Sequence, residues 1–179
     1  MQIQNTHEWC TSKGIPFRQT DYSTESLLRF FNASKATTLI SLLNIFEKDS
    51  FLVAHRNIIT ACQQSDRCKR FIGSEWIGDI EKYPLSPPFY AETRAPIRII
   101  LEHQQDVEYT AVCPGWLIDH FVPAKETYMK HAPFSPIEPD EWKALIRGSG
   151  NEKVSFVLMR DVAKAVCALC LASRGSWVS

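Results

Sequence analysis

Apolar residues follow two alternating patterns along the chain. Short continuous apolar runs, bounded by polar or turn residues, are typical of strands that are covered on both faces of a sheet. Between these runs, apolar residues return every three or four positions, which is typical of amphipathic helices. The runs predict strands at residues 14–20, 36–44, 69–74 and 108–113. This alternation predicts parallel strands joined by helical crossovers, and hence an α/β fold in one domain over residues 1–179.

Polar residues at the starts of the helical stretches identify their N-caps. The predicted caps are Ser23 or Thr24, Asp49 for residues 50–64, and Asp161 for the last helix. A helix at residues 89–104 contains Pro96 near its middle, which predicts a kink or a later start. Regularity fades between residues 116 and 139. Two further strands, at residues 143–147 and 153–159, are predicted to flank a turn at residues 148–151.

Parallel sheets of this kind bind their ligands beyond the carboxyl ends of the strands. The chain segments that follow the predicted strands are therefore the places where a site is expected. These segments are residues 21–23, 41–44, 74–78 and 113–116.

Charge and hydropathy exclude two classes of partner. Lys plus Arg equals Asp plus Glu, at 20 each, and no basic cluster is present, so nucleic acid is not expected as a partner. No apolar stretch approaches the ~18 residues of a spanning helix. The first residues also lack the basic and apolar parts of a secretory signal, so no membrane association is expected.

Cysteines and histidines give no sign of a metal site. Cys167 and Cys170 form the one close pair of cysteines and would allow a redox or metal site, but their helical, apolar surroundings favour buried thiols. His55, His103 and His120 are isolated and lack metal-ligand spacing, so no metal is predicted. Cysteines without a disulfide framework indicate a reducing compartment, and we expect a cytoplasmic protein.

A glycine-rich loop is missing from the sequence. A dinucleotide site needs closely spaced glycines after its first strand, so that backbone amides and a helix N-terminus can meet the pyrophosphate. No three of the seven glycines have that spacing. The nearest approach, Gly148-Ser149-Gly150, lies between two predicted strands and is interpreted as a turn.

Several phrases, in order, resemble one protein family. Cys-Lys-Arg-Phe-Ile-Gly-Ser-Glu-Trp at residues 68–76 resembles the KRFIPSEFG segment of the NmrA-like family, which are atypical short-chain dehydrogenase relatives that include isoflavone reductase-like proteins. The segments at residues 89–98, 109–116, 148–151 and 160–165 fit the same family in the same order, with phrasing nearest to fungal members. The resemblance covers roughly residues 14–172.

The resemblance implies a Rossmann-like parallel sheet that lacks its first two strands and the glycine-rich loop. Residues 14–20 resemble the third strand of the family, so the chain is expected to be N-terminally truncated. The loss would expose an edge of the apolar strand at residues 36–44. Three outcomes are then open: residues 14–20 pair with this strand directly, a protein partner or a second copy covers the edge, or the chain folds poorly. By family, the expected activity is NADPH-dependent reduction of a small-molecule intermediate in fungal secondary metabolism.

Two residues are candidates for catalysis. Tyr90 and Arg94 have the Tyr-x-x-x-Lys spacing of related reductases, with Arg in place of Lys. The i, i+4 spacing would place both side chains on one helix face, where a cation could lower the pKa of the tyrosine or hold an oxyanion. An ordinary helix with a packing Tyr and a surface Arg is the alternative interpretation.

The remaining candidates follow from their positions at strand ends or in the irregular region. Asp21, Ser41, Ser74 and Glu75 are candidate cofactor-binding residues, although Asp21 also suits a turn and Glu75 could cap one. Trp116, Phe121 and Met129 are candidates to line a substrate pocket, and could equally belong to a core. Three other functions stay open: a redox-inert regulatory or protein-binding module, a cofactor-free isomerase or cyclase, and an inactive remnant.

Overall fold

The computed structural model describes residues 10–76, 80–123, 136–146 and 148–177. The chain divides into two compact units. We call Gln19–Cys113 with Val166–Ser179 the sheet unit, and Met1–Arg18 with Pro114–Ala165 the hairpin unit. One domain over residues 1–179 stays a prediction.

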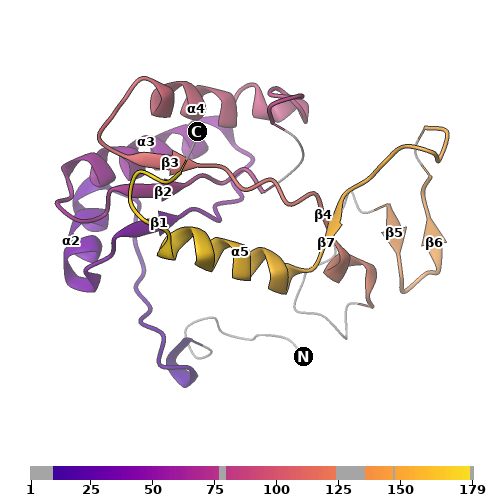
Figure 1. Cartoon of the computed structure of the whole chain (residues 1–179), viewed down its shortest axis with the longest axis horizontal. Coiled ribbons are helices and arrows are strands. Elements are labelled where there is room, and N and C mark those ends of the chain that lie inside the picture. Colours follow the sequence, from indigo (N-terminus) through magenta and orange to yellow (C-terminus); the bar gives the residue numbers. More distant parts are fainter. Residues whose placement is uncertain (1–9, 77–79, 124–135, 147, 178–179) are drawn as a thin grey trace. The chain divides into compact units, whose positions relative to one another are not determined.

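A three-stranded parallel sheet forms the centre of the sheet unit (Figure 1). Its strands are β1 (Thr38–Ile40), β2 (Arg70–Ile72) and β3 (Glu108–Thr110), in the order β1-β2-β3. The chain passes through a helix between each strand and the next, as in a parallel α/β protein. The predicted α/β fold with parallel strands is confirmed.

Three helices accompany the sheet: α2 (Thr24–Ser34), α3 (Lys48–Gln64) and α4 (Arg94–Glu102). The predicted cap Ser23 is confirmed, since its hydroxyl accepts a hydrogen bond from the Ser26 N–H. The cap predicted at Asp49 is wrong. Glu47 caps α3 instead, because its carboxylate accepts hydrogen bonds from the N–H groups of both Asp49 and Ser50. The Glu47 side chain is long enough to reach these donors in the first turn from the N-cap position.

The prediction of a later start for α4 is confirmed. A short 3₁₀ helix, η1 (Pro88–Tyr90), precedes α4, which begins at Arg94. Pro96 therefore lies in the first turn, where the missing N–H would have no partner within the helix in any case.

One face of the sheet packs against these helices to form the core. Leu39, Phe71 and Tyr109 are neighbours in register across the three strands, and all three contact the same apolar cluster. The helices contribute the rest of that cluster, including Leu27, Phe31, Phe51, Ile58, Ile59, Ile97 and Leu101. The core thus depends on side chains from α2, α3 and α4 together.

The opposite face of the sheet carries a buried charge. Arg70 lies 3.0 Å (Nε) from Glu108 (Oε2) on the adjacent strand and stacks 3.8 Å from the centre of the Trp177 ring. Its Nη1 donates to the backbone carbonyls of Cys170 and Ala172, both at 3.1 Å. Helix α5 (Met159–Leu171) ends in the sheet unit, so the segment after it is anchored to β2 through Arg70.

Two strand predictions fail, one entirely and one in part. Residues 14–20 form no regular strand, and Ile15 and Phe17 are exposed. The run at residues 36–44 forms only the three-residue β1, and Ile40 and Leu42 are exposed rather than covered on both faces. For the run at residues 36–44 the reason is position: within the described residues β1 pairs only with β2 and lies at the edge of the sheet.

The hairpin unit is built from two-residue strands. β4 (Trp116–Leu117) pairs in parallel with β7 (Phe156–Val157), and β5 (Ile137–Glu138) pairs antiparallel with β6 (Lys143–Ala144). The short 3₁₀ helix η2 (Ile118–Phe121) follows β4. The two strands predicted around residues 148–151 therefore exist only in part, and each pairs with a different strand.

The turn between those strands is held by one carboxylate. Glu152 accepts hydrogen bonds from the Ser149 and Gly150 N–H groups, both at 2.9 Å. The interpretation of Gly148–Gly150 as a turn is confirmed. Helix α5 begins at Met159, two residues before the predicted cap Asp161, because the Asp119 carboxylate accepts the Met159 N–H at 2.8 Å.

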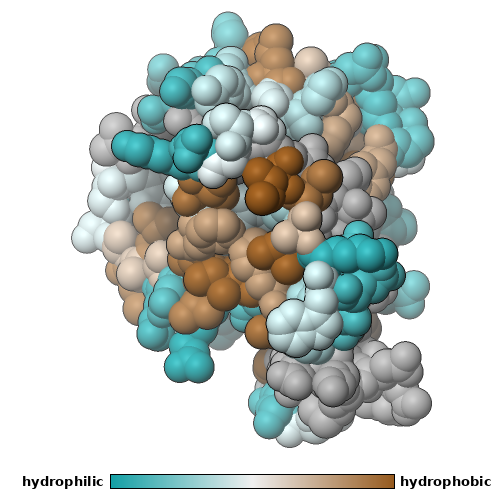
Figure 2. Space-filling view, turned by 90° about the vertical axis from the view of Figure 1, so that its right-hand side faces the viewer, coloured by the Kyte–Doolittle hydropathy of each residue, from teal (hydrophilic) through white to brown (hydrophobic). Residues whose placement is uncertain are grey.

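Apolar residues also reach the surface, as the brown regions of Figure 2 show. Cys167 is exposed and Cys170 is partly exposed, so the prediction that both thiols are buried is wrong.

Among the described residues, no three His, Cys, Asp or Glu side chains are placed to hold a metal ion. In the same residues, none of the helices has the length and hydropathy that a membrane crossing requires.

Candidate functional site

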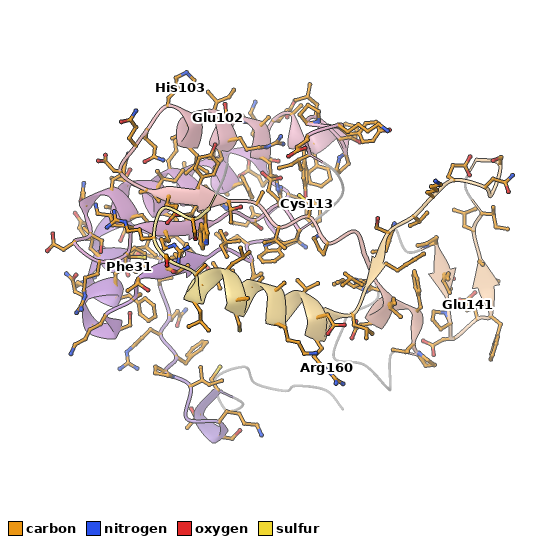
Figure 3. The ribbon with its side chains drawn as sticks, in the orientation of Figure 1. Phe31, Glu102, His103, Cys113, Glu141 and Arg160 are labelled. Atoms are coloured by element: carbon orange, nitrogen blue, oxygen red, sulfur yellow. The ribbon has the colours of Figure 1, made fainter. Side chains whose placement is uncertain are left out.

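Five of the predicted residues lie in one region near the carboxyl ends of β1 and β2. Ser41 follows β1 directly, Ser74 and Glu75 follow β2, and Arg94 opens α4. Figure 3 labels residues near and far from this region. Cys113 lies where the chain has left β3, on the side of the strand ends, whereas Glu102 and His103 lie at the opposite end of α4. We call Ser41, Ser74, Glu75, Tyr90 and Arg94, with His55 and Arg98, the strand-end cluster.

Ser41 is paired with His55, which the sequence brings into consideration only as a metal ligand. Its hydroxyl lies 3.1 Å from His55 Nε2, and His55 Nδ1 lies 2.9 Å from the carbonyl oxygen of Phe51. A carbonyl only accepts hydrogen bonds, so Nδ1 carries the proton and the Ser41 hydroxyl donates to Nε2. The position of His55, four residues after Phe51 on the buried face of α3, is the signal that could have identified it.

Burial keeps His55 neutral. The imidazole is almost fully inaccessible and stacks on the Phe51 ring, with centroids 3.9 Å apart. Burial lowers the pKa of His55 to about 4, and the charge of Arg94 acts in the same direction, against the hydrogen bond to Phe51. The Ser41–His55 pair is thus an uncharged hydrogen-bonded couple at neutral pH.

Ser74 and Trp76 tie the ends of the two strands together. The Ser74 hydroxyl donates to the Leu43 carbonyl at 2.8 Å, and the Trp76 indole N–H donates to the Ser41 carbonyl at 2.7 Å. Both bonds span more than thirty residues of sequence. Ser74 therefore positions the loop after β1, and its hydroxyl proton is already used.

Tyr90 lies in η1, outside the helix that contains Arg94, so the predicted shared helix face is wrong. Its hydroxyl donates to the backbone carbonyl of Glu75 at 2.6 Å and is buried. Burial raises the pKa of Tyr90 and outweighs the lowering by Arg94. The expected lowering of the tyrosine pKa is therefore wrong, because desolvation exceeds the attraction of the cation.

Arg94 is enclosed by aromatic rings rather than exposed. Its guanidinium carbon lies 4.1 Å from the Phe51 ring centre, 4.7 Å from that of Tyr90 and 5.4 Å from that of Phe89. Nε donates to the Ser74 carbonyl at 3.4 Å and Nη1 to the Thr93 hydroxyl at 3.1 Å. The alternative of a surface Arg is excluded. Arg94 and Tyr90 do meet, through a cation–π contact.

Glu75 pairs with an arginine one helical turn beyond Arg94. Arg98 Nε lies 3.2 Å from Glu75 Oε1, while Arg98 Nη2 donates to the Pro84 carbonyl at 2.6 Å. Glu75 is only 6% exposed. Burial raises its pKa, against the lowering by Arg98 and Arg94. The i, i+4 spacing of Arg94 and Arg98 is the signal that could have pointed to Arg98.

The remaining predicted residues lie outside this cluster. The Asp21 carboxylate accepts hydrogen bonds from the backbone N–H and the hydroxyl of Ser23, so Asp21 serves a turn before α2. Trp116 and Phe121 belong to the hairpin unit, where the Phe121 ring packs 5.3 Å from that of Phe156. Met129 lies outside the described residues.

A nicotinamide dinucleotide fits these residues at one end only. The strand-end cluster offers buried hydrogen-bonding groups and two cations where a ligand ring or a reacting oxygen could lie. The pyrophosphate normally needs a glycine-rich turn that lets the backbone approach it, and the sequence contains no such glycine spacing. The described residues therefore suit the part of a dinucleotide that would lie over the strand ends, and not its pyrophosphate.

Known proteins resemble this chain in sequence and in fold. No family model matches it. Two curated fungal proteins, both named oxidoreductase swnR, are similar over 169 residues: the one from Metarhizium robertsii is 43% identical and the one from Arthroderma benhamiae is 41% identical. The chain is thus similar in sequence to fungal oxidoreductases. The match covers 93% of this chain and 54% of each relative, so the chain spans about half their length.

The fold is also found in a solved structure. The leucoanthocyanidin reductase of Vitis vinifera, in its binary complex with NADPH, superimposes with a TM-score of 0.60. The superposition covers 90% of this chain and 49% of that chain, at 20% identity. The predicted Rossmann-like architecture is confirmed, and membership of the NmrA-like family stays a prediction.

Proposed function

We propose that this chain contributes the strand-end part of a nucleotide-dependent oxidoreductase site, which uses NADPH to reduce a small-molecule intermediate of fungal secondary metabolism. The observation that carries the proposal is the strand-end cluster, in which Ser41, Ser74, Glu75 and Arg94 are all buried at the carboxyl ends of adjacent parallel strands. Similarity to the two fungal oxidoreductases supports the reaction class.

The chemistry divides between cofactor and protein. A bound reduced nicotinamide supplies a hydride. The cluster supplies a positive field, since Arg94 and Arg98 carry two positive charges against the single negative charge of Glu75. Such a field stabilises negative charge that develops on a carbonyl oxygen during reduction. Tyr90, which donates to a backbone carbonyl, positions the loop that carries Glu75.

We also propose a cytoplasmic location. Cys62 and Cys68 are buried thiols without a disulfide, which supports a reducing compartment. The test is to oxidise the protein until a disulfide forms. If its unfolding transition is then unchanged, the result would argue against this location.

Titration with NADPH tests the proposed function. Energy transfer from tryptophan to the bound nicotinamide should rise with the NADPH concentration and reach saturation by about 1 mM. A dissociation constant in the upper part of that range is expected, because the sequence lacks the glycine spacing that would hold the pyrophosphate. Arg94→Met should weaken the binding of NADPH at least about threefold, because the positive charge is lost. Arg29→Met, on the exposed side of α2, is the matched control and should change nothing. Absence of saturation, or equal affinity in both variants, would overturn the proposal.

A second function is favoured by the edge of β1. Within the described residues β1 pairs only on one side, and Leu42 just beyond it is 71% exposed. An open strand edge beside apolar side chains suits strand addition by a protein partner or a second copy. Light scattering should then show self-association that Leu42→Lys reduces, whereas a monomer at high concentration would exclude self-pairing.

A further inference from the structure

We propose that the Glu75 carboxylate accepts a hydrogen bond from an uncharged N–H or O–H group of a bound ligand, for which a primary carboxamide is the test case. The choice of a carboxamide rests on the proposed function, because nicotinamide carries one. The hydrogen-bond acceptor itself follows from the structure alone.

The observation behind this inference is an unused oxygen. Glu75 is more than nine-tenths buried, and its Oε2 accepts no hydrogen bond from any described residue. Buried carboxylate oxygens are normally paired, because an unpaired one keeps the full cost of its desolvation. Oε2 lies at the carboxyl end of β2, where parallel α/β sheets bind their ligands.

The neighbouring side-chain donors make no hydrogen bond to Oε2. Arg98 Nε lies 3.2 Å from Oε1 as an ion pair and makes no hydrogen bond, while Arg98 Nη2 donates to the Pro84 carbonyl. Arg94 donates to the Ser74 carbonyl and the Thr93 hydroxyl. The Tyr90 hydroxyl donates to the backbone oxygen of Glu75 and not to its carboxylate. The geometry leaves Oε2 for a donor that the described residues do not supply.

The charges around Glu75 define the kind of donor. Two arginines and one glutamate leave an excess of one positive charge in the cluster. A cationic ligand group would be repelled by that excess, and a carboxylate has no N–H to offer Oε2. An uncharged donor satisfies both conditions. The carboxamide has the further advantage of two N–H groups.

Nicotinamide and nicotinate form a matched pair of probes, since they share the ring and differ in the donor. Saturation-transfer NMR with the whole chain should show nicotinamide binding at least about tenfold more tightly than nicotinate. The carbon-13 resonance of the Glu75 carboxyl, assigned by its absence in Glu75→Gln, should move on addition of nicotinamide only.

Variants test whether Glu75 is the acceptor. Glu75→Gln keeps the shape of the side chain and should weaken nicotinamide binding about tenfold, because a hydrogen bond to a charged group is lost. It should not weaken nicotinate binding. Glu102→Gln, at the far exposed end of α4, is the matched control and should leave both unchanged. Thermal melts of each variant confirm that it is folded, and Glu75→Asp, which withdraws the carboxylate, provides a second test.

The outcomes separate this inference from the proposed function. If nicotinamide does not bind, or binds Glu75→Gln as tightly as the unaltered chain, the role of Glu75 is overturned. If NADPH binds with equal affinity to Glu75→Gln and to the unaltered chain, the proposed function stands and the role of Glu75 is overturned. If nicotinamide binding depends on Glu75 but NADPH does not bind, the role of Glu75 stands and the proposed function falls.

Discussion

The sheet unit and the hairpin unit use their apolar residues in opposite ways. Every described residue that is buried, apolar or polar, belongs to the sheet unit. In the hairpin unit Trp142 is 97% exposed, and Leu145, Ile146 and Phe156 are exposed too. The difference follows from layering: three helices and a sheet can enclose a core, whereas paired strands of two residues cannot.

This comparison predicts where the stability of the protein resides. In the sheet unit, buried polar residues such as Arg70, Glu75 and Arg94 lie beside the core and have hydrogen-bond or ion-pair partners. They therefore share the rigidity of the core, which a site needs to hold its geometry. The hairpin unit should contribute little to the free energy of unfolding of the sheet unit.

The largest effect is expected at the centre of the core. Phe71 lies on the middle strand and is fully buried. Phe71→Ala should lower the free energy of unfolding by about 4 kcal/mol, because it removes the burial of the ring and leaves a cavity. Chemical denaturation measures this loss. A loss below about 1 kcal/mol would contradict the assignment of the core to the sheet unit.

The next effect depends on pH and reports on His55. Its pKa of about 4 in the folded chain lies below the 6.5 of the unfolded chain. Between these values the unfolded state binds more protons, so stability should fall as the pH drops from 6.5 to 4, by up to about 3 kcal/mol. His55→Gln should abolish that part of the pH dependence. Identical pH profiles for both proteins would show that His55 titrates normally.

A smaller effect is expected from the hydroxyl of Tyr90. Tyr90→Phe removes the donor to the buried Glu75 carbonyl and keeps the ring against Arg94. The loss should be about 1 to 2 kcal/mol, the cost of an unpaired buried carbonyl. Thermal unfolding measures it. If Tyr90 were instead the proton donor of the reaction, Tyr90→Phe would abolish turnover with little change in stability.

The smallest effect is expected in the hairpin unit. Trp142→Ala removes the largest of the exposed side chains and should change the free energy of unfolding by less than about 0.5 kcal/mol. Denaturation beside Phe71→Ala provides the direct comparison. A large loss on removal of Trp142 would show that this ring has a partner in solution and would break the contrast between the units.

Several features of the candidate site are predictable from local sequence. The apolar runs locate β1, β2 and β3, and the residues after them locate Ser41, Ser74 and Glu75 at strand ends. The later start of α4 follows from Pro96. These predictions succeed because they depend on near neighbours in the chain, whose spacing determines hydrogen bonding within helices and strands.

Other features fail for a common reason. The strand expected at residues 14–20 has a suitable pattern, but a strand also needs a neighbour to accept its hydrogen bonds. Local composition likewise shows that residues of the hairpin unit are apolar, but it does not decide whether their side chains are buried. Pairing and burial depend on residues that are distant in sequence.

By itself, the sequence determined the alternation of strands and helices, the end of the sheet at which polar residues gather, and the absence of a glycine-rich loop. Only the tertiary structure decided which atoms meet there. Ser41 faces His55, Glu75 faces Arg98, and the Tyr90 hydroxyl faces a carbonyl rather than open space. The physical reason is that a hydrogen bond is chosen by distance and direction between groups far apart in the chain, which no local pattern records.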